Sequence, residues 1–455
     1  MTVLRIAFAL GLLGYFVWRG RSCRLFLLGI PFLLVTSDSL FITSLRPLFM
    51  PGRVAHEWRV LGWLVLAWAL TFWNPEKRGS RRPFGGPISL PEEFLFAGVF
   101  GLVALNAVVS LVSGESPGVV ASLVVTQWGP LGAGYLLVRG VFSVHSRQQT
   151  MQFLTALAWV SVLGAILFIL HQGLGLHIYP GPATLVVDFQ GRTLTRTVPI
   201  APTYFYLMVV LPLCQERFSL RWAAMLALAC LTLAVSYSRG AVLMSVALIL
   251  GLAVIRGVAG GSVVMLLRRL IAPAILVALA ALFLAVVLPT QAAYFLDRFG
   301  GFGGERLAPD YQLARVNPIL AAANTIQDPV FGNGFTAESA SSKALASGVD
   351  TAWVLIVHGL GWVGVAMVAG MLAAYMYRAV RLSLRSQFGQ GRFGLLLLGL
   401  TLPMILQVFL SSAFLDQGSS ALGLWVFALV AVEAVRSRGE FDSGRLHNME
   451  LSRFR

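Results

Sequence analysis

Residues 221–256 read RWAAMLALACLTLAVSYSRGAVLMSVALILGLAVIR, which is two apolar runs on either side of one arginine. The runs, 221–237 and 241–256, approach the roughly 17–25 residues that a helix needs to cross a hydrocarbon core about 30 Å thick. Arg239 stands between them. An intramembrane arginine costs about 2.5–3.5 kcal/mol at a helix centre and less near the interface. This stretch therefore predicts two membrane spans that meet near a membrane surface, at Arg239.

Similar runs recur along the whole chain of 455 residues, of which 57% are hydrophobic and only 12% are charged. The alternating ten-residue strands of an outer-membrane barrel are absent. We therefore predict an all-α polytopic membrane protein with about 13 transmembrane helices, and a total of twelve to fourteen fits the pattern. The predicted spans are 3–18, 25–45, 60–73, 94–113, 117–138, 151–171, 198–214, 221–237, 241–256, 270–289, 351–376, 393–413 and 420–435.

The distribution of Lys and Arg predicts the orientation of the spans. With the N-terminus outside, 23 of the 34 Lys and Arg residues fall in cytoplasmic connections or in the tail from Arg436, as the positive-inside rule requires. The connection 46–59, with three arginines, is an exception. This bias and the basic tail account for most of the net charge of +15, so we expect no nucleic-acid partner. The three cysteines show no paired spacing and predict neither a disulfide framework nor a metal site.

Two connections on the predicted outer face are long, 172–197 and 290–350. Loops of this length usually carry function or are disordered. Within the second, RVNPILAAANTI places Asn317 and Pro318 as the cap and first residue of a helix, followed by apolar residues at helical spacing. We predict a short helix on the outer surface, ended by QDPVFGNGF, in which Asp328 is a turn residue.

Arginines gather on the same predicted face. Besides Arg239 they are Arg192, Arg196, Arg298, Arg306 and Arg315. Guanidinium groups match phosphate oxygens, so several of them around one cleft would suit a lipid-linked phosphate or pyrophosphate. The alternative for each arginine alone is a solvated surface charge, or for Arg239 a side chain that reaches the headgroups and does nothing else.

Three stretches together resemble the bacterial O-antigen polymerase and O-antigen ligase superfamily. They are SYSRGAVL at Arg239, ARVNPILAAANTIQDPVFGNGF in the long loop, and DTAWVLIVHGLGWVG over 350–364. The resemblance covers roughly 200–430, while residues 1–190 match only as generic spans. It implies a GT-C-like helical fold with an N-terminal transmembrane part (1–190), a core (191–435) that includes the outer loop 290–350, and a basic cytoplasmic tail (436–455).

The third stretch departs from the ligase pattern at its first two residues. Ligases have His followed by Asn, Ser or Gln, whereas this chain has Asp350 and Thr351 with the spacing to Gly361 and Gly364 kept. The resemblance implies that Asp350 is the base for the acceptor hydroxyl and that Arg239 stabilises the leaving group. Asp350 could instead only cap the following helix. His358, a little over two turns further on, faces a similar direction and is expected to line the same cavity or to be buried and hydrogen-bonded.

As the resemblance implies it, the activity is an inverting, metal-independent glycosyl transfer without a cofactor. The donor is an undecaprenyl-pyrophosphate-linked glycan at the periplasmic face of the inner membrane. Loss of the ligase His favours a polymerase that joins repeat units, and Arg192, Arg196, Arg306 and Arg315, with His358, are the expected substrate-binding residues. An O-antigen ligase or protein O-glycosyl ligase, and a secondary transporter, are the alternatives. Expected partners are the lipid-linked donor, the glycan acceptor, membrane lipid, a flippase and a chain-length regulator.

Overall fold

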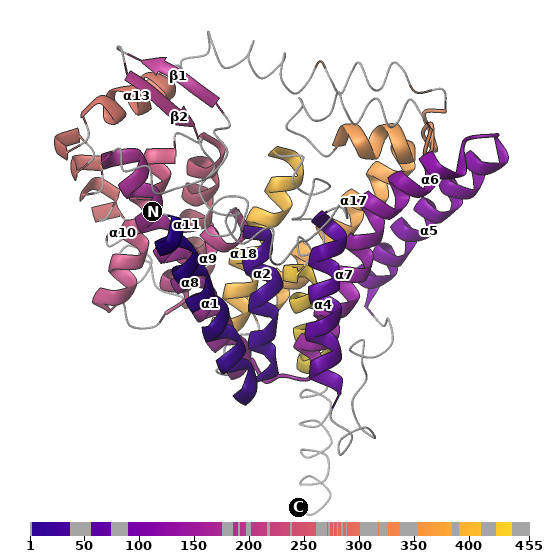
Figure 1. Cartoon of the computed structure of the whole chain (residues 1–455), viewed down its shortest axis with the longest axis horizontal. Coiled ribbons are helices and arrows are strands. Elements are labelled where there is room, and N and C mark those ends of the chain that lie inside the picture. Colours follow the sequence, from indigo (N-terminus) through magenta and orange to yellow (C-terminus); the bar gives the residue numbers. More distant parts are fainter. Residues whose placement is uncertain are drawn as a thin grey trace, which may run out of the picture.

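Helices make up most of the chain that the structure, a computed structural model, describes (Figure 1). The described residues are 2–36, 56–73, 90–174, 185–189, 192–196, 202–215, 219–236, 239–260, 289–300, 328–336, 353–384, 391–410 and 425–438, with short pieces between 271 and 287 and single residues at 317 and 326. The predicted surface helix after Asn317 lies almost wholly outside them.

The helices follow the predicted apolar runs. In chain order they are α1 (Thr2–Ser22), a 3₁₀ turn η1 (Arg24–Leu28), α2 (Gly29–Thr36), α4 (His56–Phe72), α5 (Pro91–Val112), α6 (Pro117–Leu123), a π turn η3 (Val124–Trp128), α7 (Gly129–Ser143), α8 (Arg147–Leu174), α9 (Pro202–Cys214), α10 (Leu220–Ser236), α11 (Arg239–Gly260), α13 (Pro289–Gly300), α17 (Trp353–Leu384), α18 (Gly391–Leu410) and a last helix over 425–438.

Within the described part of the chain, three helices are long and apolar enough to cross a membrane: α5, α8 over Arg147–Leu170, and α17 over Ile356–Leu384. Shorter apolar helices surround them, among them α9 and α10. This is the composition of a membrane protein, as predicted. The total of about 13 spans and the GT-C-like class stay predictions.

Several details differ from the prediction. The run 117–138 is three pieces, α6, η3 and α7, because Pro130 just after η3 lacks the amide hydrogen and clashes with the preceding turn. The second predicted span begins as a 3₁₀ turn rather than an α-helix. The two long connections that were predicted to lie outside also hold a hairpin, β1 (Leu185–Phe189) paired antiparallel with β2 (Arg192–Arg196), and helix α13, neither of which the apolar pattern predicted.

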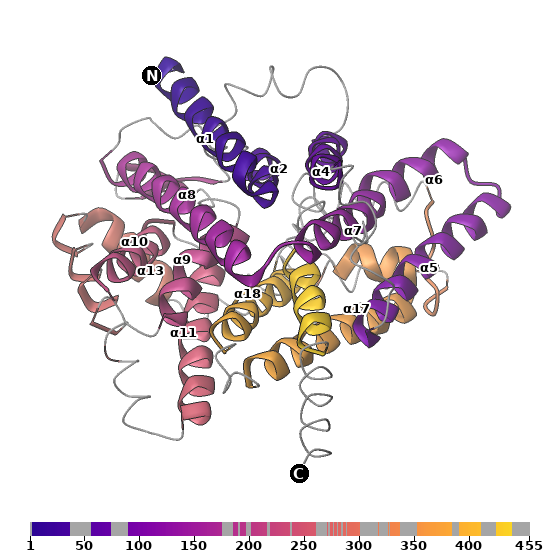
Figure 2. The same cartoon turned by 90° about the horizontal axis from the view of Figure 1, so that it is seen from below.

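Helix α17 packs against α5 and α18 (Figure 2). The last helix, 425–438, is buried along most of its length and meets α17 through the Tyr375 and Phe427 rings, whose centroids are 4.7 Å apart. Helix α5 from the first part of the chain thus packs on α17 from the second, and α8 packs on α9. The packing continues across the predicted division at residue 190.

Buried ion pairs join the helices at one end of this bundle, which we call the charged end. Glu92 and Glu93 open α5. Glu93 lies 2.6 Å from Arg139 on α7, and Glu92 lies 2.6 Å from Arg378 on α17. Arg147 at the start of α8 pairs with Glu433 on the last helix, and Arg436 donates to carbonyls at the end of α7. The distribution of Lys and Arg predicts that these helix ends lie on the cytoplasmic face. Part of the excess of arginine on that face is therefore paired with buried carboxylates rather than exposed to solvent.

Candidate functional site

Helix α17 is broken at Gly361. Its φ of +61° and ψ of −164° lie in a region that is essentially restricted to glycine. A Cβ atom built on Gly361 would overlap the Gly332 nitrogen and the Val330 carbonyl. The loop 328–336, which carries the motif Asp-Pro-Val-Phe-Gly-Asn-Gly, therefore rests directly on the backbone of the break.

The loop accepts the amide hydrogens that the break releases. In an unbroken helix the amides of Trp362 and Val363 would donate to carbonyls four residues back. Here Trp362 donates to the Pro329 carbonyl at 3.0 Å, and Val363 donates to the Val330 carbonyl at 3.1 Å. The loop replaces the missing turn of helix for both amides.

New donors also reach the two carbonyls that the break leaves without a helical partner. The His358 carbonyl accepts from the Asn333 amide of the loop at 2.8 Å, and the Gly359 carbonyl accepts from the side-chain Nδ2 of Asn106 on α5 at 3.0 Å. An unsatisfied backbone group costs several kcal/mol in a bilayer, so a break is tolerated only where protein or water replaces these bonds. The loop and α5 together replace the backbone hydrogen bonds that the break removes.

Helix α5 binds the loop as well as the break. Nδ2 of Asn106 also donates to the Phe331 carbonyl at 3.0 Å. One turn further on, Oγ of Ser110 accepts from the Phe335 amide at 2.8 Å and donates to the Asn106 carbonyl at 2.9 Å. Both side chains are buried. Neither residue is among the predicted site residues, although a polar side chain inside an apolar run is itself a signal of function.

The loop turns at Asp328, as QDPV predicted. Oδ1 of Asp328 accepts from the amides of Val330 at 2.8 Å and Phe331 at 3.2 Å, and the Asp328 carbonyl accepts from the Gly332 amide at 2.7 Å. The carboxylate is exposed, and the turn uses only one of its two oxygens. Asp328 thus shapes the loop and keeps one oxygen at its surface.

His358 is buried beneath the loop, with 2% of its surface exposed. Its Nε2 lies 3.3 Å from Nδ2 of Asn333. Because an amide nitrogen only donates, Nε2 is the acceptor in this contact. The environment is that of the buried, hydrogen-bonded histidine that was one of the two alternatives, and His358 is not among the described residues that line the adjacent pocket.

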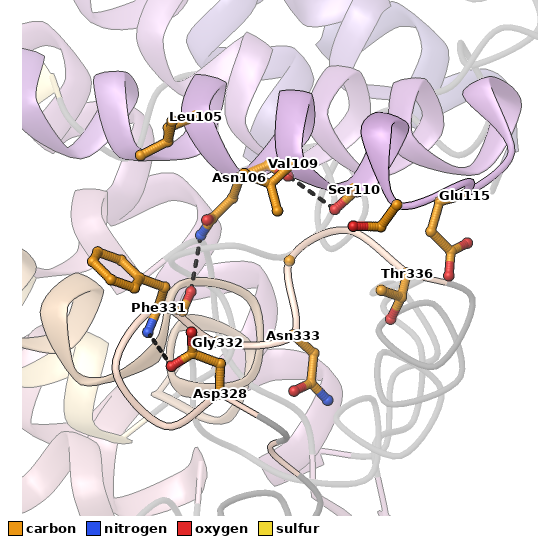
Figure 3. Close-up of a pocket in the computed structure, with 12 residues that line it drawn as sticks. Leu105, Asn106, Val109, Ser110, Glu115, Asp328, Phe331, Gly332, Asn333 and Thr336 are labelled. Carbon is orange, nitrogen blue, oxygen red and sulfur yellow. Dashed lines mark hydrogen bonds between the residues drawn. The ribbon is translucent and has the colours of Figure 1, made fainter.

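A pocket of about 660 Å³ opens between the C-terminal part of α5 and the loop (Figure 3). The lining residues are Leu105, Asn106, Val109, Ser110, Ser113, Glu115, Asp328, Phe331, Gly332, Asn333, Gly334 and Thr336. Polar groups predominate toward the end of α5, where Glu115 and Thr336 lie at the same end of the pocket in Figure 3. Within the described residues no three metal-ligating side chains gather.

The pocket lies far from the charged end. Along α5, Ser110 comes about 17 residues after Glu93, which at 1.5 Å per residue is roughly 25 Å. Along α17, Arg378 comes about 20 residues after His358, or roughly 30 Å. The pocket and the ion pairs therefore occupy opposite ends of the two helices. This agrees with a site on the face opposite the predicted cytoplasmic connections.

Replacing Asn106 by Asp tests how α5 holds the loop. Asn106→Asp keeps the shape but removes both donated hydrogen bonds and turns a carboxylate toward two carbonyl oxygens. We expect a loss of about 2–3 kcal/mol or more in stability, measured as a lower melting temperature of the purified protein in detergent. The matched control is Ser116→Asp, at the exposed N-cap of α6, where Asp is a favoured residue. Equal melting temperatures for the two variants would contradict the role assigned to Asn106.

The predicted arginines are only partly placed. Arg239 is the first residue of α11, just after α10 ends at Ser236, so the two predicted spans do meet there. Arg192 and Arg196 are the end residues of β2, opposite Phe189 and Leu185 of β1. Among the described residues that line the pocket there is no arginine. Arg306, Arg315 and Asp350 lie outside the described residues, so the convergence of the arginines on one cleft stays a prediction.

No protein-family model matches the chain, and no curated protein matches it.

Proposed function

We propose that the protein is a membrane glycosyltransferase that joins undecaprenyl-pyrophosphate-linked oligosaccharide repeat units at the periplasmic face of the bacterial inner membrane. One observation carries the proposal. Two of the three stretches that resemble the polymerase and ligase superfamily, 328–334 and 357–364, are hydrogen-bonded to each other around the break at Gly361. A pocket with both apolar and polar lining residues opens directly beside them.

The proposed chemistry assigns one role to each predicted residue. Transfer with inversion needs a base for the acceptor hydroxyl and stabilisation of the negative charge that grows on the leaving pyrophosphate. We assign the first role to Asp350 and the second to Arg239, with Arg192, Arg196, Arg306 and Arg315 holding the two lipid pyrophosphates. The α10–α11 junction supports the assignment of Arg239, because it places this residue at the end of two apolar helices rather than within one.

A secondary transporter is the second candidate, because transporters build their sites from broken helices. Those breaks lie near the bilayer midplane, with half-helices on either side. In α17 the residues from Trp362 to Leu384 make roughly 35 Å of helix, enough by themselves to cross a core about 30 Å thick. The break at Gly361 therefore falls close to one membrane surface, which favours the transferase.

Substituting Arg239 in cells tests the proposal. In a deletion strain complemented with Arg239→Gln we expect at least a tenfold loss of high-molecular-weight surface polysaccharide, with single repeat units left, because the leaving group loses its charge partner. Gel analysis of the extracted polysaccharide measures chain length. The control is Arg256→Gln, which removes an arginine near the other end of α11, and immunoblots of membranes check expression.

The deletion strain itself separates polymerase from ligase. Surface glycan capped with single repeats supports a polymerase. Complete loss of attached glycan, with lipid-linked polymer accumulating, supports a ligase. Wild-type polymer length and yield with normally expressed Arg239→Gln would refute the role of Arg239.

A further inference from the structure

The described walls of the pocket carry negative charge only. Glu115 and Asp328 contribute carboxylates, and no described lining residue is Lys or Arg. Pyrophosphate in such a pocket would face like charges without a counter-charge, which disfavours its binding. The chemistry of the pocket therefore differs from that proposed for the arginines.

Glu115 is held at the rim by the way α5 ends. The Gly114 amide donates to the Leu111 carbonyl at 3.2 Å, and the Glu115 amide donates to the Ser110 carbonyl at 3.0 Å. These two bonds form a Schellman motif, which stops the helix and fixes the chain that follows. The Glu115 side chain forms no hydrogen bond or ion pair within the part of the chain that the structure describes. The residue is half-buried, its backbone is fixed by these bonds, and its carboxylate is available to accept hydrogen bonds.

Phe331 supplies an aromatic surface on the loop side. Its amide donates to Asp328 and its carbonyl accepts from Asn106, so its backbone is fixed at both ends. The ring is nevertheless 45% exposed and lines the pocket. The negative face of an aromatic ring attracts the C–H groups of an apolar surface such as that of a pyranose. Carboxylates that accept from hydroxyls, beside an aromatic ring, suit a sugar.

The pocket also lies where a lipid-linked molecule can reach it. On α5, Leu105 and Val109 line the pocket and are about half exposed, and Val112 one turn further on is 83% exposed. In a membrane protein such apolar exposure faces lipid. The pocket therefore has an apolar side continuous with the lipid-facing surface and a polar side toward the end of the helix.

We propose that this pocket is the acceptor subsite: it binds the sugar end of the acceptor glycan and accepts saccharides without acidic groups. Glu115 and Oδ2 of Asp328 accept hydrogen bonds from sugar hydroxyls, and Phe331 packs on the ring face. The inference rests on the proposed function and deepens it. An acceptor fits better than a donor, because the reacting sugar of a donor lies next to its own pyrophosphate.

Binding to the full-length protein in nanodiscs tests the inference. Ligand-observed NMR measures the binding of three probes, the saccharides through their protons and pyrophosphate through its phosphorus signal. The probes are the free repeat-unit oligosaccharide released by mild acid from the host's lipid-linked pool, a digalacturonate, and inorganic pyrophosphate. We expect the oligosaccharide to bind and the digalacturonate to bind at least about tenfold more weakly. Glu115→Gln and Phe331→Ala should each weaken oligosaccharide binding about tenfold, because each removes one principal contact. Neither variant should change the pyrophosphate signal.

Matched controls separate the site from general effects. Phe94→Ala removes an exposed ring near the opposite end of α5, and Glu115→Asp keeps the charge on a shorter side chain. Phe94→Ala should leave binding unchanged, and Glu115→Asp should bind better than Glu115→Gln. Failure of the wild type to bind the oligosaccharide, or equal binding by Glu115→Gln, Phe331→Ala and wild type, overturns the inference. Loss of pyrophosphate binding in Glu115→Gln overturns it too.

The outcome is independent of the Arg239 experiment. If the polymer depends on Arg239 while Glu115→Gln binds the oligosaccharide normally, the pocket inference falls and the proposed function stands. If Arg239→Gln leaves the polymer unchanged but oligosaccharide binding needs Glu115, the assigned transfer chemistry falls and the saccharide pocket stands.

Discussion

Gly361→Ala is expected to remove most of the folded protein from the membrane fraction. Alanine pays a conformational penalty of about 1–3 kcal/mol at this φ and ψ, and its Cβ would overlap the backbone of Gly332 and Val330. Relief of the overlap would separate the loop from α17 and leave the amides of Trp362 and Val363 without acceptors. We expect a total loss above about 4 kcal/mol, which is exceptional for one substitution.

Size-exclusion chromatography of a fluorescent fusion, heated in detergent before injection, measures the stability. The loss appears as a lower temperature at which half of the monodisperse peak disappears. Gly359→Ala, two residues earlier, is the matched control, because its Cβ meets nothing within 4 Å. Alanine is the better helix former, so this variant should be unchanged or more stable by about 0.5–1 kcal/mol. If Gly361→Ala and Gly359→Ala have the same melting temperature, the contact between the loop and the break at Gly361 does not stabilise the protein as described.

Glu93→Gln is expected to cause the second large loss, at the charged end. The side chains of Arg139 and Glu93 are 3% and 2% exposed, and Tyr135 also donates to Glu93 at 3.3 Å. Removal of the carboxylate leaves the guanidinium buried without its counter-charge, which costs about 3–5 kcal/mol. The same thermal assay measures it, and Glu115→Gln, at a half-buried carboxylate without a described partner, should melt close to the wild type.

A double variant distinguishes a charge effect from a packing effect. Glu93→Leu with Arg139→Met removes both charges and keeps apolar volume, and such replacements of buried ion pairs are often neutral or stabilising. The double variant should therefore be more stable than Glu93→Gln alone. If it is less stable, or if Glu93→Gln melts with the wild type, the pair does not hold α5 to α7 as its burial indicates.

Local patterns predicted the helices of this chain, while the contacts between them needed the structure. The meeting of α10 and α11 at Arg239 and the turn at Asp328 follow from apolar length and turn chemistry, which act over a few residues. The partners of Asn106 lie 225 and 253 residues away. No spacing rule connects side chains so far apart, so neither the helix break nor the pocket beside it could be derived.

Glycine at 361 illustrates the same limit. In the sequence, Gly361 is distinguished only by its spacing from Asp350, since a glycine inside an apolar run is compatible with a continuous helix. What breaks α17 is the loop carbonyls that accept its amides, together with Asn106 on a distant helix. Similarly, Arg139 directly follows the predicted span 117–138 and reads as part of a connection, because its pairing with Glu93 depends on how α5 packs.

The broken helix α17 has a consequence for biogenesis. Its donors and acceptors near Gly361 are satisfied by a segment synthesised shortly before it and by Asn106, which leaves the ribosome about 250 residues earlier. Until it packs against α5, a nascent α17 that is broken at Gly361 would leave the Gly359 carbonyl without a donor in lipid, at a cost of several kcal/mol. Folding of α17 should therefore require that α5 stays near the translocation channel until α17 is inserted. Separately expressed halves should survive only when made together.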